Sequence, residues 1–310
     1  MCIPLPKNYK GLIAAREAII VIFLYAAVMC VMYGPVVFSG KSLMPPLYQP
    51  HGIVPEGVYA REGRLPASTF NVDLATPAYY EFPTNKLVGD MYKNLTIPLW
   101  NPYQAGGTPL AAQYSTRAFF PYQIIEDISP VGWWDFFMLG RLLFAGFFTY
   151  LFLRYNGKNG LGLLASFAGG LFYMFSGVFT WFISLEQFTN TAMTLPLVML
   201  GVDALAKRGG SLRSQSRAVA FCSVCVSLLL LAGQPEVALY ATLLAFVYFI
   251  YAELSFNGSS GILRRFLKFP VAYALGLGLS AFLLIPFLEL VGLSFHIHPL
   301  GGRIGAQGLV

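Results

Sequence analysis

Long apolar runs, separated by short polar segments, dominate the chain. They predict membrane-spanning helices at residues 17–38, 133–153, 162–183, 188–206, 218–233, 236–253 and 268–290. Each run is about 16–23 residues long, close to the length at which an α-helix crosses ~30 Å of hydrocarbon. Only Gly233-Gln234-Pro235 separates the fifth run from the sixth, and such a turn favours a helical hairpin over one long kinked helix.

Residues 39–132 break this pattern. They are rich in Pro, Tyr, Gly and amide side chains, and they lack a run long enough to span a membrane. The stretches 77–94 and 110–128 predict short amphipathic helices that lie along the membrane interface. We therefore expect an all-α polytopic membrane protein with about seven transmembrane helices and a large first loop.

Composition supports this class. The 310 residues are 56% hydrophobic and only 11% charged, whereas about a quarter of the residues in a soluble domain carry charge. The aromatic content of 16% suits helices with aromatic side chains at both membrane interfaces. A lipid bilayer is therefore the expected surroundings of most of the chain.

Basic residues collect before the first predicted span and after the second, fourth and sixth, which all lie on one side of a seven-span protein. They are Lys7, Lys10, Arg16, Arg154, Lys158, Lys207, Arg208, Arg213, Arg217, Arg264, Arg265 and Lys268. The positive-inside rule places this side in the cytoplasm. The net charge of +6 is thus a topology signal, and we expect no nucleic-acid partner.

This topology divides the chain into five parts. Residues 1–16 form the cytoplasmic N-terminus, 17–38 an uncleaved signal-anchor helix, 39–132 an extracytoplasmic loop, 133–290 a six-helix bundle, and 291–310 an extracytoplasmic C-terminal segment. The predicted loop and the short turns between the spans then meet at the outer face of the bundle, where we look for functional residues.

Asp73 lies in an otherwise apolar stretch of the predicted loop, Phe70 to Ala75. Partial burial would raise the pKa of its carboxyl group and make it a suitable general base. The alternative is that Asp73 caps a helix or is an ordinary exposed loop acid.

Two predicted outer turns each carry one amide and one carboxylate, Glu186 with Gln187 and Gln234 with Glu236. Such groups bind the hydroxyls of a sugar well. The alternative is that they cap helices, since a carboxylate in the first turn is favoured by the helix dipole.

Arg141 is a charged residue inside the second predicted span. A charge at this depth is costly and usually faces the bundle interior or a watery cavity. It could bind a phosphate that enters from the membrane, or form a structural ion pair, for which Glu289 is one candidate partner.

Signals for a metal are weak. His296 and His298 alternate after the last predicted span, and Cys222 and Cys225 have CxxC spacing, but the latter pair lies within an apolar run. No metal ligand set is predicted, and the cofactor, including a divalent metal, stays open.

The predicted loop carries a recognisable block. Trp100-Asn101-Pro102-Tyr103, then Gly106-Gly107-Thr108-Pro109 and Phe119-Phe120-Pro121, with Asp73 upstream, resembles the loop signature of the YfhO family of bacterial membrane proteins. Span motifs such as Gly233-Gln234-Pro235-Glu236 add to the resemblance, which covers most of residues 65–295.

YfhO-type proteins resemble the GT-C superfamily of membrane glycosyltransferases. The resemblance implies a GT-C-like core in the bacterial cytoplasmic (inner) membrane, and transfer of a sugar from a polyprenyl-phosphate carrier to a cell-envelope glycan or polymer acceptor outside. It implies a base on the acceptor hydroxyl at Asp73. Donor phosphate would be bound by Arg141 and Arg117, and sugar or acceptor by Glu186, Gln187, Gln234, Glu236, Trp100 and Asn101.

Two other classes of function stay open. One is a transporter or flippase of lipid-linked glycans, which would move its substrate without covalent change. The other is a non-catalytic membrane scaffold or truncated remnant. Family members continue beyond the seventh span, so an N-terminal fragment of a longer enzyme is also an expectation.

Overall fold

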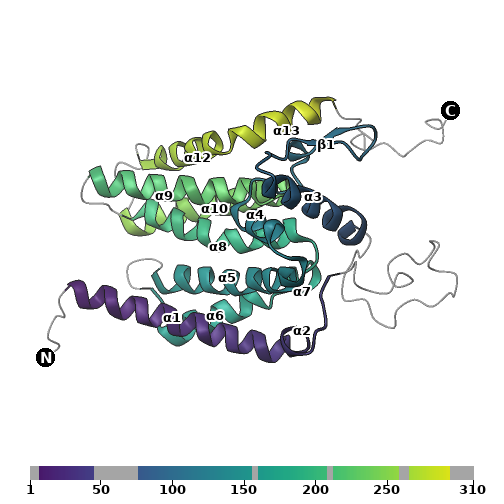
Figure 1. Ribbon diagram of the computed structural model, residues 1–310. Helices are drawn as coiled ribbons and strands as arrows, with labels where there is room; N and C mark the ends of the chain where they lie inside the picture. The colour runs from purple at the N-terminus through teal and green to yellow at the C-terminus, as the bar shows by residue number, and fades with distance from the viewer. Residues whose placement is uncertain (1–6, 45–75, 156–159, 208–211, 258–264, 294–310) are drawn as a thin grey trace, which may run out of the picture.

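The chain forms a helical bundle with a small cap of short helices at one end (Figure 1). This computed structural model describes residues 7–44, 76–155, 160–207, 212–257 and 265–293. Asp73, His296 and His298 lie outside the described residues. The only strands within the described ranges are β1 (Trp100–Asn101) and β2 (Thr108–Pro109), an antiparallel pair in the cap. The fold class is therefore all-α.

The bundle helices follow the predicted runs closely. They are α1 (Lys7–Met32), α5 (Trp134–Tyr155), α6 (Leu163–Met174), α7 (Gly177–Trp181), α8 (Glu186–Ala206), α9 (Leu212–Leu231), α10 (Pro235–Asn257), α12 (Lys268–Leu279) and α13 (Ala281–Leu293). The largest difference is at α1, which begins at Lys7 and not at residue 17. A helix can continue past the edge of the hydrocarbon, so the polar residues before residue 17 lengthen α1 without lengthening the apolar span.

Among the described residues, six helical segments are long and apolar enough to cross a membrane, and the bent pair α12 and α13 is a seventh candidate. The pair turns by 78° at Ser280. Gly276 and Gly278 weaken the helix before the bend, and the buried Ser280 Oγ lies 2.8 Å from Ser227 Oγ of α9. We treat the protein as a multi-pass membrane protein.

Helix packing gives the bundle a layered order. α5 lies between α6 and α8, α9 packs against both α8 and α12, and α10 also contacts α8 (Figure 1). Large apolar side chains point outward along these helices, as Leu243 and Val247 do on α10. In water this surface would be an aggregation liability, whereas in lipid it is the expected exterior.

The cap lies at the end of the bundle where α1 ends and α5 begins, and we call this end the cap end (Figure 1). It holds a π-helical turn at Pro77–Glu81 that continues into α3 (Phe82–Lys93), the β1–β2 hairpin, and α4 (Pro121–Ile128). The basic residues Arg154, Lys207 and Lys268 belong to helix ends at the opposite end of the bundle.

Candidate functional site

Helix α3 forms the centre of the cap, and its two faces have different surroundings. Its outer face lines an open groove, its inner face supplies Asn85 to a buried polar cluster, and the π-helical turn before it supplies Glu81. On the inner side α3 packs against α4 so closely that a Cβ atom on Gly89 would overlap the backbone carbonyl of Asp127. Glycine at this position therefore allows the backbones of the two helices to touch.

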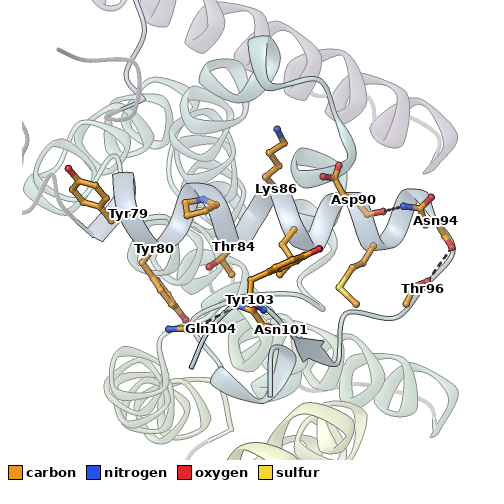
Figure 2. A pocket seen from close by; sticks show the side chains of 13 residues that line it. Tyr79, Tyr80, Thr84, Lys86, Asp90, Asn94, Thr96, Asn101, Tyr103 and Gln104 are labelled. Atoms are coloured by element: carbon orange, nitrogen blue, oxygen red, sulfur yellow. Dashed lines mark hydrogen bonds between the residues drawn. The ribbon is translucent and has the colours of Figure 1, made fainter. Parts of the chain in front are cut away.

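The groove has a volume of about 730 Å³. Figure 2 shows the tip of the hairpin, with Asn101, Tyr103 and Gln104, against α3, while Lys86 extends on the side away from Asn101 and Gln104. The lining consists of tyrosines, amide and hydroxyl side chains, and one group of each charge, namely Tyr79, Tyr80, Tyr103, Thr84, Thr96, Asn94, Asn101, Gln104, Lys86 and Asp90, with Pro83, Leu87 and Met91. Aromatic faces beside several hydrogen-bonding groups suit a polyhydroxylated ligand.

The hairpin block Trp100–Pro109 has a clear structural role. The Asn101 side-chain oxygen accepts a hydrogen bond from the Tyr103 backbone N–H at 2.9 Å, which fixes the turn. Gly107 has a φ of +118°, and a Cβ there would lie 2.6 Å from the Trp100 ring. Gly107 therefore leaves room for the Trp100 ring in the hairpin that carries Tyr103.

Beneath α3, the carboxylate of Glu186 is the centre of the buried polar cluster. Its Oε2 atom accepts hydrogen bonds from Asn85 Nδ2 at 2.7 Å, Gln123 Nε2 at 2.8 Å and Arg117 Nη2 at 3.1 Å. Glu186 begins α8, where the helix dipole also favours a negative charge. One carboxylate thus connects α3, α4, α8 and the segment before α4.

Arg141 of α5 belongs to the same cluster. It forms an ion pair with both carboxylate oxygens of Glu126, donates to Asn190 Oδ1 at 2.7 Å and to Gln123 Oε1 at 2.9 Å, and is fully buried. Its guanidinium carbon also lies 5.2 Å from the centre of the Tyr122 ring. The sequence offered Glu289 as one candidate partner of Arg141, but Glu289 is exposed, and Arg141 pairs with Glu126.

The cluster contains more acids than bases among the described residues. Glu81, Glu126, Asp127 and Glu186 are buried with two arginines, Arg117 and Arg141. Neither oxygen of Glu81 makes a hydrogen bond of normal geometry with the described residues, although Arg117 Nη1 lies 3.6 Å away.

Burial raises the pKa of three of these acids, including Glu126, whose pKa it raises to about 8 although the charge of Arg141 opposes the shift. It raises the pKa of Glu81 to about 7, although the nearby charge of Arg117 opposes the shift. Burial also raises the pKa of Asp127 well above its usual range, helped by the adjacent charge of Glu126. Protonation of any two of these three acids would leave two carboxylates opposite two guanidinium groups, which balances the charge of the cluster.

The structure brings four of the predicted site residues together: Arg117, Arg141, Glu186 and Gln187. Gln187 Oε1 accepts a hydrogen bond from Arg117 Nη1 at 3.0 Å. Both guanidinium groups are enclosed, with at most 1% of either residue exposed. They are therefore bound to protein carboxylates and amides, and neither is open to a ligand in this conformation.

The other predicted residues lie at the edges. Asn101 lines the groove, whereas Trp100 supports its hairpin. Gln234 lies on the turn between α9 and α10, and Glu236 lies in the first turn of α10, with Gln234 Nε2 3.4 Å from Glu236 Oε2. Gly233 of this turn packs directly on the side chain of Arg117, so the turn covers the cluster but its polar side chains do not enter it.

Sequence reasoning missed several members of the cluster. They are Glu81, Asn85, Gln123, Glu126, Asp127 and Asn190. A signal was present, because Gln123, Glu126 and Asp127 have i, i+3, i+4 spacing and share one face of α4, while Ile125 and Ile128 are exposed on the other. A short helix that buries its polar face and exposes its apolar face is typical of a lipid-facing position.

The part of the chain that the structure describes holds no ligand set for a metal ion. That part has no group of three or more His, Cys, Asp or Glu side chains arranged to hold an ion. Cys222 and Cys225 are buried free thiols on α9, where Cys222 faces Gly201 of α8. Their spacing serves helix packing.

Comparison with known proteins gives no relative: no family model, no curated protein and no solved structure matches the chain.

Proposed function

We propose that this protein is a membrane glycosyltransferase of GT-C type, which transfers a sugar from a polyprenyl-phosphate donor to a cell-envelope acceptor outside the cytoplasmic membrane. The observation that carries the proposal is the groove beside α3. Three tyrosines, amide groups, and Lys86 and Asp90 line it. Concave sites of this size with a few convergent polar groups are the usual binding sites of small molecules.

The orientation in this proposal follows from charge. Lys207 and Lys268 lie at the end opposite the cap, as do Arg213 and Arg217. The positive-inside rule assigns that end to the cytoplasm, so that the groove opens on the outer side. There it would meet an acceptor of the envelope and the head group of a lipid carrier in the outer leaflet.

The chemical step needs a base that removes a proton from the acceptor hydroxyl. Asp73 keeps this role in the proposal, and it precedes Thr76, the first described residue of the cap, by three positions. The attacking hydroxyl oxygen would form the new bond to the anomeric carbon while the bond from that carbon to the phosphate oxygen breaks. Transfer of the proton to a carboxylate completes the balance.

Arg141 and Arg117 have a different role in this proposal from the phosphate binding that the sequence favoured. A donor phosphate could reach Arg141 or Arg117 only by replacing Glu126 or Glu186, and burial opposes that exchange. We therefore propose that both arginines position α3 under the groove. Lys86, exposed on the groove wall, is then the cation that a donor phosphate can approach.

The test is made in cells that lack the gene, which receive the wild-type chain or one variant. The variants are Asp73→Asn, Tyr103→Ala, and Ser216→Ala as an exposed control on α9. Mass spectrometry of the envelope glycans should show that one sugar unit is lost without the gene, and restored by the wild-type and control chains only.

Three outcomes would contradict the proposal. Full restoration by Asp73→Asn at normal membrane level removes Asp73 as the base, and full restoration by Tyr103→Ala removes the groove. Loss of the entire polymer, with its lipid-linked precursor accumulating inside, would favour a flippase.

A further inference from the structure

A second cavity opens to the lipid-facing side of the bundle, between α1 and α6, far from the groove of the cap. Its volume is about 600 Å³, and its walls are the apolar side chains of Ile20 and Leu24 from α1 and of Leu163 and Leu164 from α6. Ile20 and Leu164 are 58% and 79% exposed. We call this cavity the α1–α6 groove.

A stacked aromatic pair joins α1 and α6 at the α1–α6 groove. The rings of Tyr25 and Phe167 stack with their centres 4.9 Å apart, and the Tyr25 hydroxyl donates to the Phe167 carbonyl at 2.9 Å. Gly170 permits this approach, because a Cβ there would overlap the Tyr25 hydroxyl. These contacts join the two helices beside the cavity, which Phe167 also lines.

The end of the α1–α6 groove distant from the cap is charged. Glu17 is already neutralised, since Arg154 Nε lies 2.7 Å from its Oε1 atom and the Tyr150 hydroxyl also donates to it. Arg154 Nη1 in addition donates to the Leu161 carbonyl at 3.1 Å. Arg16 lines the same end, is exposed, and makes no ion pair with any described residue. One uncompensated positive charge therefore remains there.

We propose that the α1–α6 groove binds one anionic phospholipid of the adjacent leaflet, with an acyl chain along Ile20 and Leu164 and the head-group phosphate beside Arg16. From Arg16 to Leu24 the groove follows α1 for about 12 Å, counting 1.5 Å per residue. An apolar channel that ends in a single cation at the membrane edge complements an anionic amphiphile. Basic pockets between helices on the cytoplasmic side of a membrane recognise such head groups. The inference is independent of the proposed glycosyltransferase activity.

The experiment uses the full chain, purified in detergent and titrated with phosphatidylglycerol or phosphatidylcholine, with bound lipid counted by native mass spectrometry. We expect phosphatidylglycerol to bind the wild-type chain more tightly than phosphatidylcholine. Arg16→Gln should weaken phosphatidylglycerol binding about fivefold, the effect of one basic residue near a membrane surface. Arg213→Gln removes an exposed charge at the same end of the bundle and should change nothing.

A second variant tests the channel itself. Leu164→Trp fills the α1–α6 groove without changing charge, so it should reduce the binding of both lipids while the protein keeps its elution volume and thermal midpoint.

Four results would overturn the proposal. The first two are equal binding of the two lipids to the wild-type chain and unchanged binding in Arg16→Gln. The third is an equal loss of binding in Arg213→Gln, which would indicate diffuse surface charge. The fourth is a dimer that Leu164→Trp dissociates, which would make the groove a contact between two copies of the chain.

Discussion

Asn85 and Glu186, 101 positions apart in the sequence, are joined by a hydrogen bond of 2.7 Å between buried side chains. Asn85 belongs to the inner face of α3, whose outer face lines the groove, and Glu186 begins α8. The position of the groove wall is therefore set from within the bundle. Substitutions in the buried polar cluster should therefore change the shape of the groove, although the substituted residues lie outside it.

The ion pair between Arg141 and Glu126 should be a major determinant of stability. Arg141→Met leaves a buried carboxylate without its cation, and we expect a loss of about 3–5 kcal/mol. Thermal unfolding of the detergent-purified protein, followed by size-exclusion chromatography, measures this loss.

A second substitution shows whether the two residues act together. Adding Glu126→Gln to Arg141→Met removes the unpaired charge and should recover part of the lost stability. An additive decrease in the double variant would mean that the pair contributes through packing alone. Arg217→Gln, at an exposed position, serves as the control for loss of a positive charge.

Glu81 should make stability depend on pH. Because its pKa is raised to about 7 in the folded protein, the folded state holds a proton that the unfolded state releases near pH 4.5. Its contribution to stability is therefore present below pH 4.5 and lost as the pH rises through 7.

Glu81→Gln mimics the protonated form of this side chain. It should raise the thermal midpoint at pH 8 and leave it nearly unchanged at pH 4.5. Equal effects at the two pH values would show that folding does not raise the pKa of Glu81. The comparison needs only the wild-type chain and one variant in two buffers.

Gly233 should not tolerate a side chain. Its φ of +109° is strained for other residues, and a Cβ would overlap the Arg117 side chain. We expect Gly233→Ala to cost about 1–3 kcal/mol from backbone strain alone. Gly278→Ala is the matched control, since no atom lies within 4 Å of that Cβ position in α12, and it should be neutral or slightly stabilising. Similar midpoints for the two variants would contradict this account of the turn.

Labelling of single cysteines tests the membrane orientation. In a chain whose four native cysteines are replaced, Thr96→Cys places a thiol in the cap and Ser216→Cys places one at the opposite end; both positions are exposed. A membrane-impermeant maleimide added to intact cells should label the cysteine at 96 only, and permeabilisation should expose the one at 216. The reverse pattern would place the groove in the cytoplasm.

The spans were readable from the sequence because lipid imposes a simple rule of apolar length. The hairpin at Gly233 to Pro235 was predicted for a similarly local reason, and the structure has separate helices α9 and α10 there. The break between α6 and α7, and the 78° bend at Ser280, were not predicted. Both occur inside runs of uniform hydropathy. There, packing against neighbouring helices determines where a helix breaks or bends, and no periodic pattern in the sequence indicates the position.

The candidate site was predictable only in part. Arg141 was conspicuous as a charge inside a span, but its partner Glu126 comes from the loop, and only the fold brings the two together. The residues of α4 were readable in principle from their spacing. The groove was not, because it depends on the close approach of α3 to the hairpin, which a single sequence does not encode in any local pattern.

The bend at Ser280 has a consequence for assembly. It turns α13 over the cap, where Phe287 packs against Tyr114 and Phe282 against Phe119, while the Tyr114 hydroxyl donates to the Leu230 carbonyl of α9. The cap precedes α13 in the chain, so residues 110–120 remain without this cover until α13 has been synthesised and inserted. The part of the molecule that carries the groove is therefore synthesised before the helix that completes its packing.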